Sequence, residues 1–204
     1  MKANRLVISM VFTAAAAMAR ASGPPGPCCT PGAKDAAPEA VISNRSVYQL
    51  GATWSDDAGK PTPLASLQGS AVLLAMFFTN CEYACPMVVG EMKRIQEGLP
   101  VALRARTRLV LVSFDSDRDS PATLRLYRGR MGLGDDWVLL HGQSDDVREL
   151  AMVLGVKFAK DSRGQFAHSN LITVLNPEGE IAFQRAGLTG DISAAIKALT
   201  VAAQ

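Results

Sequence analysis

Two cysteines, Cys81 and Cys85, lie four positions apart in the string FTNCEYACP and are the residues of this chain best suited to chemistry. An apolar run at 71–78 precedes them and Pro86 follows, so we expect a buried strand to end here and a helix to begin. A helix N-terminus favours thiolate over thiol and lowers a cysteine pKa. The pair could therefore close a disulfide, attack one in a target, or hold a soft metal ion such as Cu(I) or Zn(II).

His168 is a candidate third ligand, because imidazole also binds copper. It lies in the string GQFAHSN, directly before an apolar run at 171–175, and an α/β sheet can bring this position close to the cysteines. Spacing alone does not separate a ligand from an ordinary hydrogen-bonded histidine. The second histidine, His141, follows a short apolar run, and we interpret it as structural.

The elements predicted around these residues alternate between strand and helix. Continuous apolar runs predict buried strands at 71–78, 109–114 and 137–140. Apolar spacing and capping residues predict helices that begin at Pro86, at Ser120-Pro121, at Ser144 and at Asp191. One hairpin is predicted at 48–64, with its turn at 57–59, and another at 171–185. This order predicts an α/β fold, a thioredoxin-like three-layer fold with a central mixed sheet and an N-terminal hairpin.

The composition limits the class of binding partner, and the first residues indicate the cellular compartment. The chain has 21 basic and 19 acidic residues, a balance that offers little attraction for nucleic acid. Residues 1–21 have the basic start, apolar stretch and Ala-x-Ala end of a secretory signal peptide, which predicts an exported, periplasmic protein. If the leader is not cleaved, it would keep the chain at the membrane. Residues 22–45 predict a Pro/Gly-rich flexible tether containing Cys28 and Cys29, and residues 46–204 predict one domain.

Three strings of the chain together resemble the Sco/SenC family of copper chaperones for cytochrome c oxidase assembly. They are FFTNCEYACP, VSFDSDRDSP and FAHSNLITVLNPEGEIAFQ, and the resemblance runs from about Tyr48 to the last helix. It implies copper as the bound metal and Cys81, Cys85 and His168 as its ligands. Many members carry an acidic residue just before the histidine, where this chain has Ala167.

The second string contains two acidic positions, Asp115 and Asp119, that match the family. From the residues alone, we expect turn and capping chemistry there, with Asp119 and Ser120 introducing the helix at Pro121.

The resemblance implies a copper metallochaperone that delivers one copper ion to the copper centre of cytochrome c oxidase. Its partners would be the copper-receiving oxidase subunit and a copper-donor chaperone or thiol reductant. Membrane contact is expected only through an uncleaved leader or a partner. The alternative is an enzyme, a thiol-disulfide reductase in which Cys81 and Cys85 form the redox-active pair and act on cysteines of an oxidase subunit or another exported protein. Peroxide reduction is less well supported, because a distant resolving cysteine is not evident.

Overall fold

A computed structural model of the chain describes residues 43–162 and 164–204. The predicted signal peptide, most of the predicted tether and the pair Cys28 and Cys29 lie outside the described residues. Within the described part, no helix is both long enough and apolar enough to cross a membrane.

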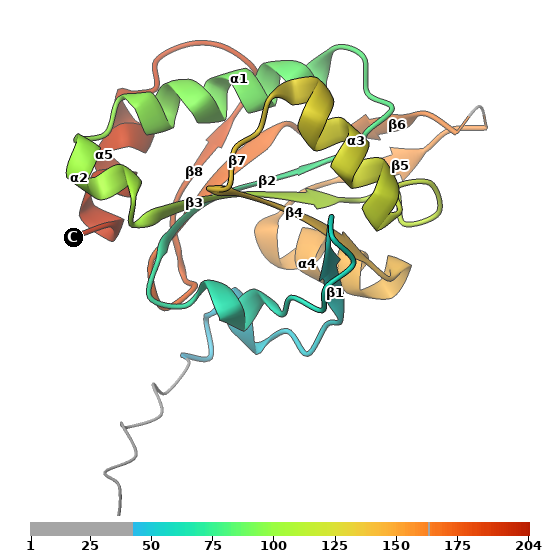
Figure 1. Cartoon of the computed structure of the whole chain (residues 1–204), viewed down its shortest axis with the longest axis horizontal. Coiled ribbons are helices and arrows are strands. Elements are labelled where there is room, and N and C mark those ends of the chain that lie inside the picture. Colours follow the sequence, from blue (N-terminus) through green and yellow to red (C-terminus); the bar gives the residue numbers. More distant parts are fainter. Residues whose placement is uncertain (1–42, 163) are drawn as a thin grey trace, which may run out of the picture. The chain divides into compact units, whose positions relative to one another are not determined.

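A mixed six-stranded sheet forms the centre of the fold (Figure 1). Its strand order is β1-β4-β3-β2-β7-β8. Strands β2, β3 and β4 are parallel to one another, whereas β1, β7 and β8 each run antiparallel to their neighbour. The strands are β1 (Trp54–Asp56), β2 (Ala71–Phe77), β3 (Thr107–Ser113), β4 (Trp137–Gly142), β7 (Leu171–Leu175) and β8 (Ile181–Ala186).

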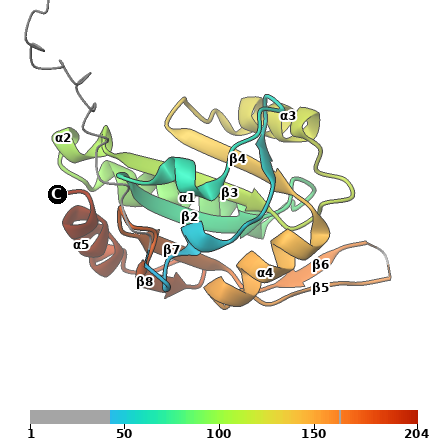
Figure 2. The ribbon, with the colours of Figure 1, turned by 90° about the horizontal axis from the view of Figure 1, so that it is seen from below.

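Helices cover both faces of this sheet, which gives the three layers predicted from the sequence. Helices α1, α3 and α5 lie on one face, and α4 lies on the other together with the first described residues (Figures 1 and 2). Helix α3 begins where predicted, because the Ser120 side chain accepts a hydrogen bond from the Thr123 N–H and Pro121 fills the first helical position. The helices are α1 (Ala84–Glu97), α2 (Val101–Arg104), α3 (Pro121–Met131), α4 (Ser144–Leu154) and α5 (Ser193–Ala202).

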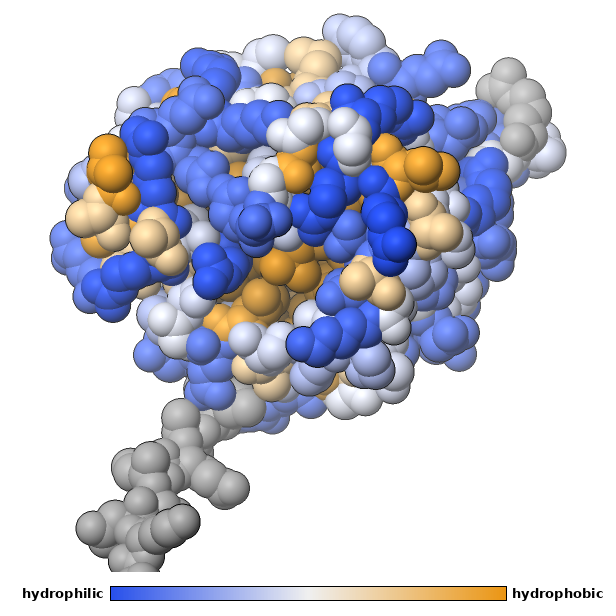
Figure 3. Space-filling view, viewed as in Figure 1, coloured by the Kyte–Doolittle hydropathy of each residue, from blue (hydrophilic) through white to orange (hydrophobic). Residues whose placement is uncertain are grey.

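The core lies on both sides of β2 and β3. Every residue of β2 is buried, and Leu109, Val110, Leu111 and Val112 of β3 are fully buried. A parallel strand covered on both faces has no solvent side, so its sequence is a continuous apolar run and does not alternate. The outer face seen in Figure 3 is mostly hydrophilic, with separated hydrophobic patches.

The N-terminal hairpin is smaller than predicted. The turn at 57–59 forms, with Gly59 at a positive φ of 81°, but its two sides meet only in one bridge between Ser55 and Pro61. The predicted strand over residues 48–53 is wrong, because Val47–Gln49 is a 3-10 turn and β1 begins at Trp54. Strand β1 pairs with β4 at the edge of the sheet instead.

A second hairpin, which the sequence analysis missed, precedes β7. Strands β5 (Phe158–Lys160) and β6 (Phe166–His168) pair antiparallel in a sheet of their own. Each strand has only three residues, too few to show a clear alternation of apolar and polar positions. The site depends on this hairpin, because it ends in His168.

Candidate metal centre

The two cysteines lie at the junction of β2 and α1, as predicted. After β2, the Cys81 N–H donates to the Phe78 carbonyl and closes a tight turn. Helix α1 begins at Ala84, so the predicted start at Pro86 is wrong by two residues and Cys85 lies inside the first helical turn. The first N–H groups of a helix lack partners within it. One of them, the Cys85 N–H, donates to the Cys81 sulfur at 3.2 Å.

His168 reaches the same place from the far end of β6. Its ring packs edge-on against Phe78, at 5.9 Å between ring centroids, and in a tilted arrangement against Phe114, at 5.0 Å. Its Nδ1 lies 3.3 Å from the Ser169 carbonyl oxygen. A proton on Nδ1 donates to that carbonyl and leaves the Nε2 lone pair free for a metal ion.

The sulfur atoms of Cys81 and Cys85 and a ring nitrogen of His168 all lie within 4.8 Å of one another. Cys85 is 1% exposed, whereas Cys81 and His168 are half-buried. Two thiolates and an imidazole form a soft donor set that suits copper in either oxidation state, and also zinc. Two thiolates bound about 2.3 Å from one tetrahedral ion would stand about 3.8 Å apart, so the two sulfurs would need to approach each other by about 1 Å at most.

The two thiols differ in acidity. The Cys85 thiol donates a hydrogen bond to the Cys81 sulfur, and this bond, aided by N–H donors and by His168, lowers the pKa of Cys81 to about 5 against the opposing effect of burial. The same hydrogen bond and burial raise the pKa of Cys85. Cys81 is therefore the thiolate of the pair at neutral pH, and it is also the more accessible sulfur.

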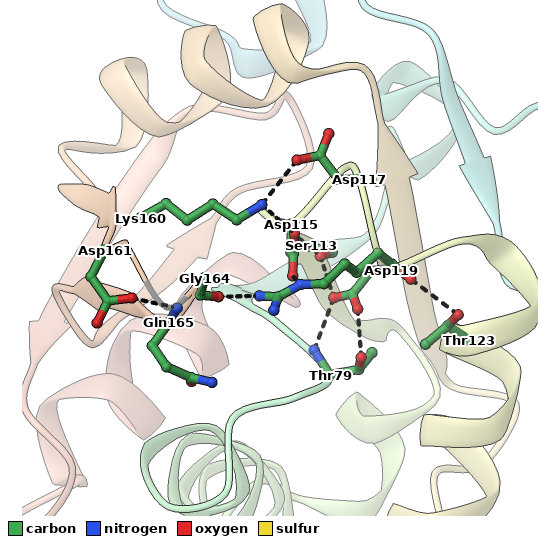
Figure 4. A network of polar contacts seen from close by, with 11 residues as sticks. Thr79, Ser113, Asp115, Asp117, Asp119, Thr123, Lys160, Asp161, Gly164 and Gln165 are labelled. Carbon is green, nitrogen blue, oxygen red and sulfur yellow. Dashed lines mark hydrogen bonds and ion pairs between the residues drawn. The ribbon is translucent and has the colours of Figure 1, made fainter.

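A buried carboxylate holds the cysteine turn against β3. The Asp119 carboxylate accepts hydrogen bonds from the Thr79 N–H at 2.8 Å, the Thr79 hydroxyl at 2.5 Å and the Ser113 hydroxyl at 2.6 Å (Figure 4). The capping prediction is correct for Ser120 and wrong for Asp119, whose side chain points inward and is 1% exposed. Its role is to tie together the ends of β2 and β3.

Solvent reaches the site beside Cys81. A hollow of about 370 Å³ is lined by Cys81, Tyr83, Phe166 and His168 among others, and Tyr83 is 73% exposed at its rim. The other histidine, His141, lies in β4 opposite Ser55 of β1. Among the described residues it does not join the cluster that could hold a metal ion.

Sequence reasoning missed the side chains that support the three candidate ligands. Thr79 and Arg118 lie inside two of the strings quoted above, but threonine and arginine at such positions have no characteristic spacing. Phe78, Phe114 and Phe166 form the aromatic wall around His168. The sequence shows that these three residues are apolar, but not that they meet around His168.

Comparison with known proteins gives one family. The SCO1/SenC family model matches residues 47–202. A Stutzerimonas stutzeri protein named "Putative copper-binding protein" is 30% identical over an alignment of 141 residues, and the match covers 67% of this chain and 67% of its own.

Solved structures agree in fold. The structure of BsSco, a member of the Sco family of cytochrome c oxidase assembly proteins, is 26% identical with a TM-score of 0.59 and covers 72% of this chain and 90% of its own. ScoI of Bradyrhizobium japonicum with copper bound is 21% identical with a TM-score of 0.62, over 74% of this chain and 96% of its own. The predicted thioredoxin-like fold is confirmed by these likenesses.

Proposed function

The chain belongs to the SCO1/SenC family, and from that premise we propose that it is a copper metallochaperone. It holds one copper ion through Cys81, Cys85 and His168 and delivers the ion to the copper centre of cytochrome c oxidase during assembly. The observation that carries the proposal is the convergence of two sulfurs and an imidazole nitrogen, from two distant segments, within 4.8 Å.

The shape of the site supports transfer. Three protein donors leave one side of a bound ion open, and the hollow beside Cys81 gives an incoming thiolate or thioether access to that side. Transfer then proceeds by ligand exchange: a partner ligand bonds to the ion before a protein ligand leaves. Cys85 is buried and acts as the fixed ligand, whereas Cys81 and His168 lie where a partner can replace them.

The test is an anaerobic Cu(I) titration of the reduced protein. Cys28 and Cys29 are changed to Ser in every sample, so that only Cys81 and Cys85 supply thiols. We expect one Cu(I) per chain, loss of tight binding in Cys81→Ser or Cys85→Ser, and weaker binding in His168→Ala.

The Cu(II) form should show an intense sulfur-to-copper charge-transfer band that disappears in either cysteine variant. The matched control is His141→Ala, which removes the second of the two histidines and should leave stoichiometry and spectrum unchanged. A Cys81→Ser protein with the wild-type spectrum would mean that the copper site is elsewhere.

The asymmetry of the thiols also supports a second candidate, the thiol-disulfide reductase. The Cys81 thiolate would attack a target disulfide, form a mixed disulfide and expel one target thiolate. Cys85, once deprotonated, would attack the Cys81 sulfur, expel the second target thiolate and leave a Cys81–Cys85 disulfide. The pair supplies both electrons, and an external thiol must reduce it again. His168→Ala separates the two functions, because reduction of a model disulfide should survive it and full copper affinity should not.

The same proposal includes compartment and partners. We propose a periplasmic location, supported by the signal-peptide pattern of residues 1–21. The copper-receiving oxidase subunit is the recipient, and a copper-donor chaperone or thiol reductant keeps the site loaded or reduced. Fractionation of cells that express the full chain tests the location.

A further inference from the structure

We propose that Arg118 is a positioning residue for His168, acting by fixing the β5–β6 hairpin to the loop between β3 and α3. The effect that we expect on copper binding rests on the proposed function. The effect on the hairpin does not, because it is measured in the metal-free protein.

The hairpin that carries His168 is not part of the central sheet. Strands β5 and β6 pair only with each other among the described residues, in the register Phe158–His168, Ala159–Ala167 and Lys160–Phe166. A two-stranded hairpin is marginally stable on its own in water. The direction in which His168 points therefore depends on side-chain contacts between the hairpin and the rest of the domain.

Arg118 makes one of these contacts and adds hydrogen bonds to the aromatic packing. Its guanidinium donates from Nε to the Asp115 carboxylate and from a terminal nitrogen to the Gly164 carbonyl at 2.5 Å, in the segment that joins β5 to β6. The same guanidinium lies 5.9 Å from the centroid of the Phe166 ring. Phe166 belongs to the aromatic wall that packs against Phe78 and Phe114 beside His168.

The contact geometry requires a glycine at position 164. Gly164 has a positive φ of 75°, and a Cβ there would lie 3.2 Å from a guanidinium nitrogen of Arg118. Glycine is the residue that adopts this conformation without steric cost and leaves room for the guanidinium.

Lys160 adds a second connection from the hairpin to the same loop. Its ammonium lies 2.9 Å from the Asp117 carboxylate and 3.6 Å from Asp115 (Figure 4). Exposed ion pairs contribute little. Asp115, however, is 1% exposed, and a buried carboxylate that loses its cationic partner is costly. Asp115 therefore holds Arg118 in a fixed direction.

One loop thus connects both halves of the site. Asp119 fixes Thr79, two residues before Cys81, while its neighbour Arg118 fixes the hairpin that ends in His168. Loss of the Arg118 contact should leave the cysteine turn in place and free only the histidine side.

The first experiment uses the reduced, metal-free full chain. We compare Arg118→Ala and Arg118→Lys with the control Arg148→Ala, which breaks an arginine–aspartate pair of the same i,i+3 spacing that lies exposed on α4. Hydrogen exchange measured by NMR should become about tenfold faster at the amides that pair β5 with β6 in Arg118→Ala, as expected for loss of a charge-assisted hydrogen bond. Lysine keeps the positive charge but lacks the branched guanidinium, so the exchange rate in Arg118→Lys should lie between those of the wild type and Arg118→Ala.

Amides of β2 and β3 should be unchanged, and the His168 ring signals should broaden or shift. Unchanged hairpin exchange in Arg118→Ala, or an equal increase across the whole domain, would overturn the inference. If Arg118→Ala does not fold, Arg118→Lys gives the same comparison.

The second experiment is a double-mutant cycle on copper retention. If Arg118 acts through His168, Arg118→Ala should weaken copper binding in the wild type and have no further effect in His168→Ala. An additive loss would contradict the positioning role. If the wild type binds no copper, the proposed function fails, while the exchange experiment still decides the structural inference.

Discussion

Replacing Asp119 should reveal how strongly the cysteine turn is tied to the sheet. Its buried carboxylate accepts three hydrogen bonds, two from Thr79 and one from Ser113. Asp119→Ala removes both acceptor oxygens, and with them all three hydrogen bonds, and leaves the Thr79 backbone N–H, which cannot rotate toward another partner, unpaired in a buried position. Asp119→Asn keeps the shape and one accepting oxygen.

The expected cost follows from these bonds. A hydrogen bond to a charged group contributes about 1.5–3 kcal/mol, and a buried donor left unpaired costs about 1–3 kcal/mol. Because the two hydroxyls can rotate to other partners, we expect Asp119→Ala to lower the free energy of unfolding by about 3–5 kcal/mol. Asp119→Asn should cost about 1–3 kcal/mol, and Thr79→Val, which removes one hydroxyl donor, about 1 kcal/mol.

Urea denaturation of the metal-free protein measures the free energy of unfolding of each variant. The matched control is Asp145→Asn, the same chemical change at a carboxylate that is 97% exposed on α4, and it should leave the midpoint unchanged. Alkylation of Cys81 gives a local readout, since a loosened turn should change its rate in the Asp119 variants and not in the control. An Asp119→Asn protein as stable as the wild type would refute the argument that this carboxylate holds the turn.

Three further outcomes are expected. The Asp57 pKa is lowered, mainly by hydrogen bonds from Arg128 at 2.6 and 3.0 Å, so its contribution to stability is present above the unfolded pKa of about 3.9 and is lost as pH falls through the folded value. The free energy of unfolding, measured at a series of acidic pH values, should therefore depend less on pH in Asp57→Asn than in the wild type. Gly142→Ala should lower the melting temperature through a loss of about 1–3 kcal/mol, because the new Cβ would lie 2.4 Å from the buried Trp54 ring. Copper should raise the melting temperature of the reduced protein, and oxidation of the cysteine pair should abolish that rise. An equal rise in the oxidised protein would mean that the thiolates are not the ligands.

The parts of the fold that could be predicted from sequence are those whose residues see a uniform environment. Strands β2 and β3 are covered on both faces, so an apolar run is sufficient to identify them. The start of α4 at Ser144 was predicted correctly, and the helix ends at Gly155, which adopts the left-handed conformation at a φ of 71°. The 3-10 turn at Val47–Gln49 and the three-residue strands β5 and β6 were missed, because so few residues carry no period and tertiary contacts decide their conformation.

The site was predictable to different extents on its two sides. Cys81 and Cys85 are close in sequence, and the strand before them and Pro86 after them indicate a helix N-terminus. His168 is far away in sequence: its position before an apolar run made it a candidate, but only the family resemblance identified it as a ligand, because its approach depends on the hairpin and on aromatic packing. The supporting contacts of Asp119 and Arg118 join segments about 40 residues apart or more, and sequence spacing contains no information about such pairs.

The position of Ala167 explains how this chain manages without the acidic residue that many family members carry there. Successive side chains of a strand point to opposite faces. In β6, Phe166 and His168 are half-buried on the face that packs against Phe78 and Phe114, and Ala167 between them is exposed. A carboxylate at 167 would therefore start from the face opposite the imidazole. In this chain the Nδ1 of His168 is oriented by the Ser169 carbonyl, so the ring has a backbone partner that no substitution at 167 removes.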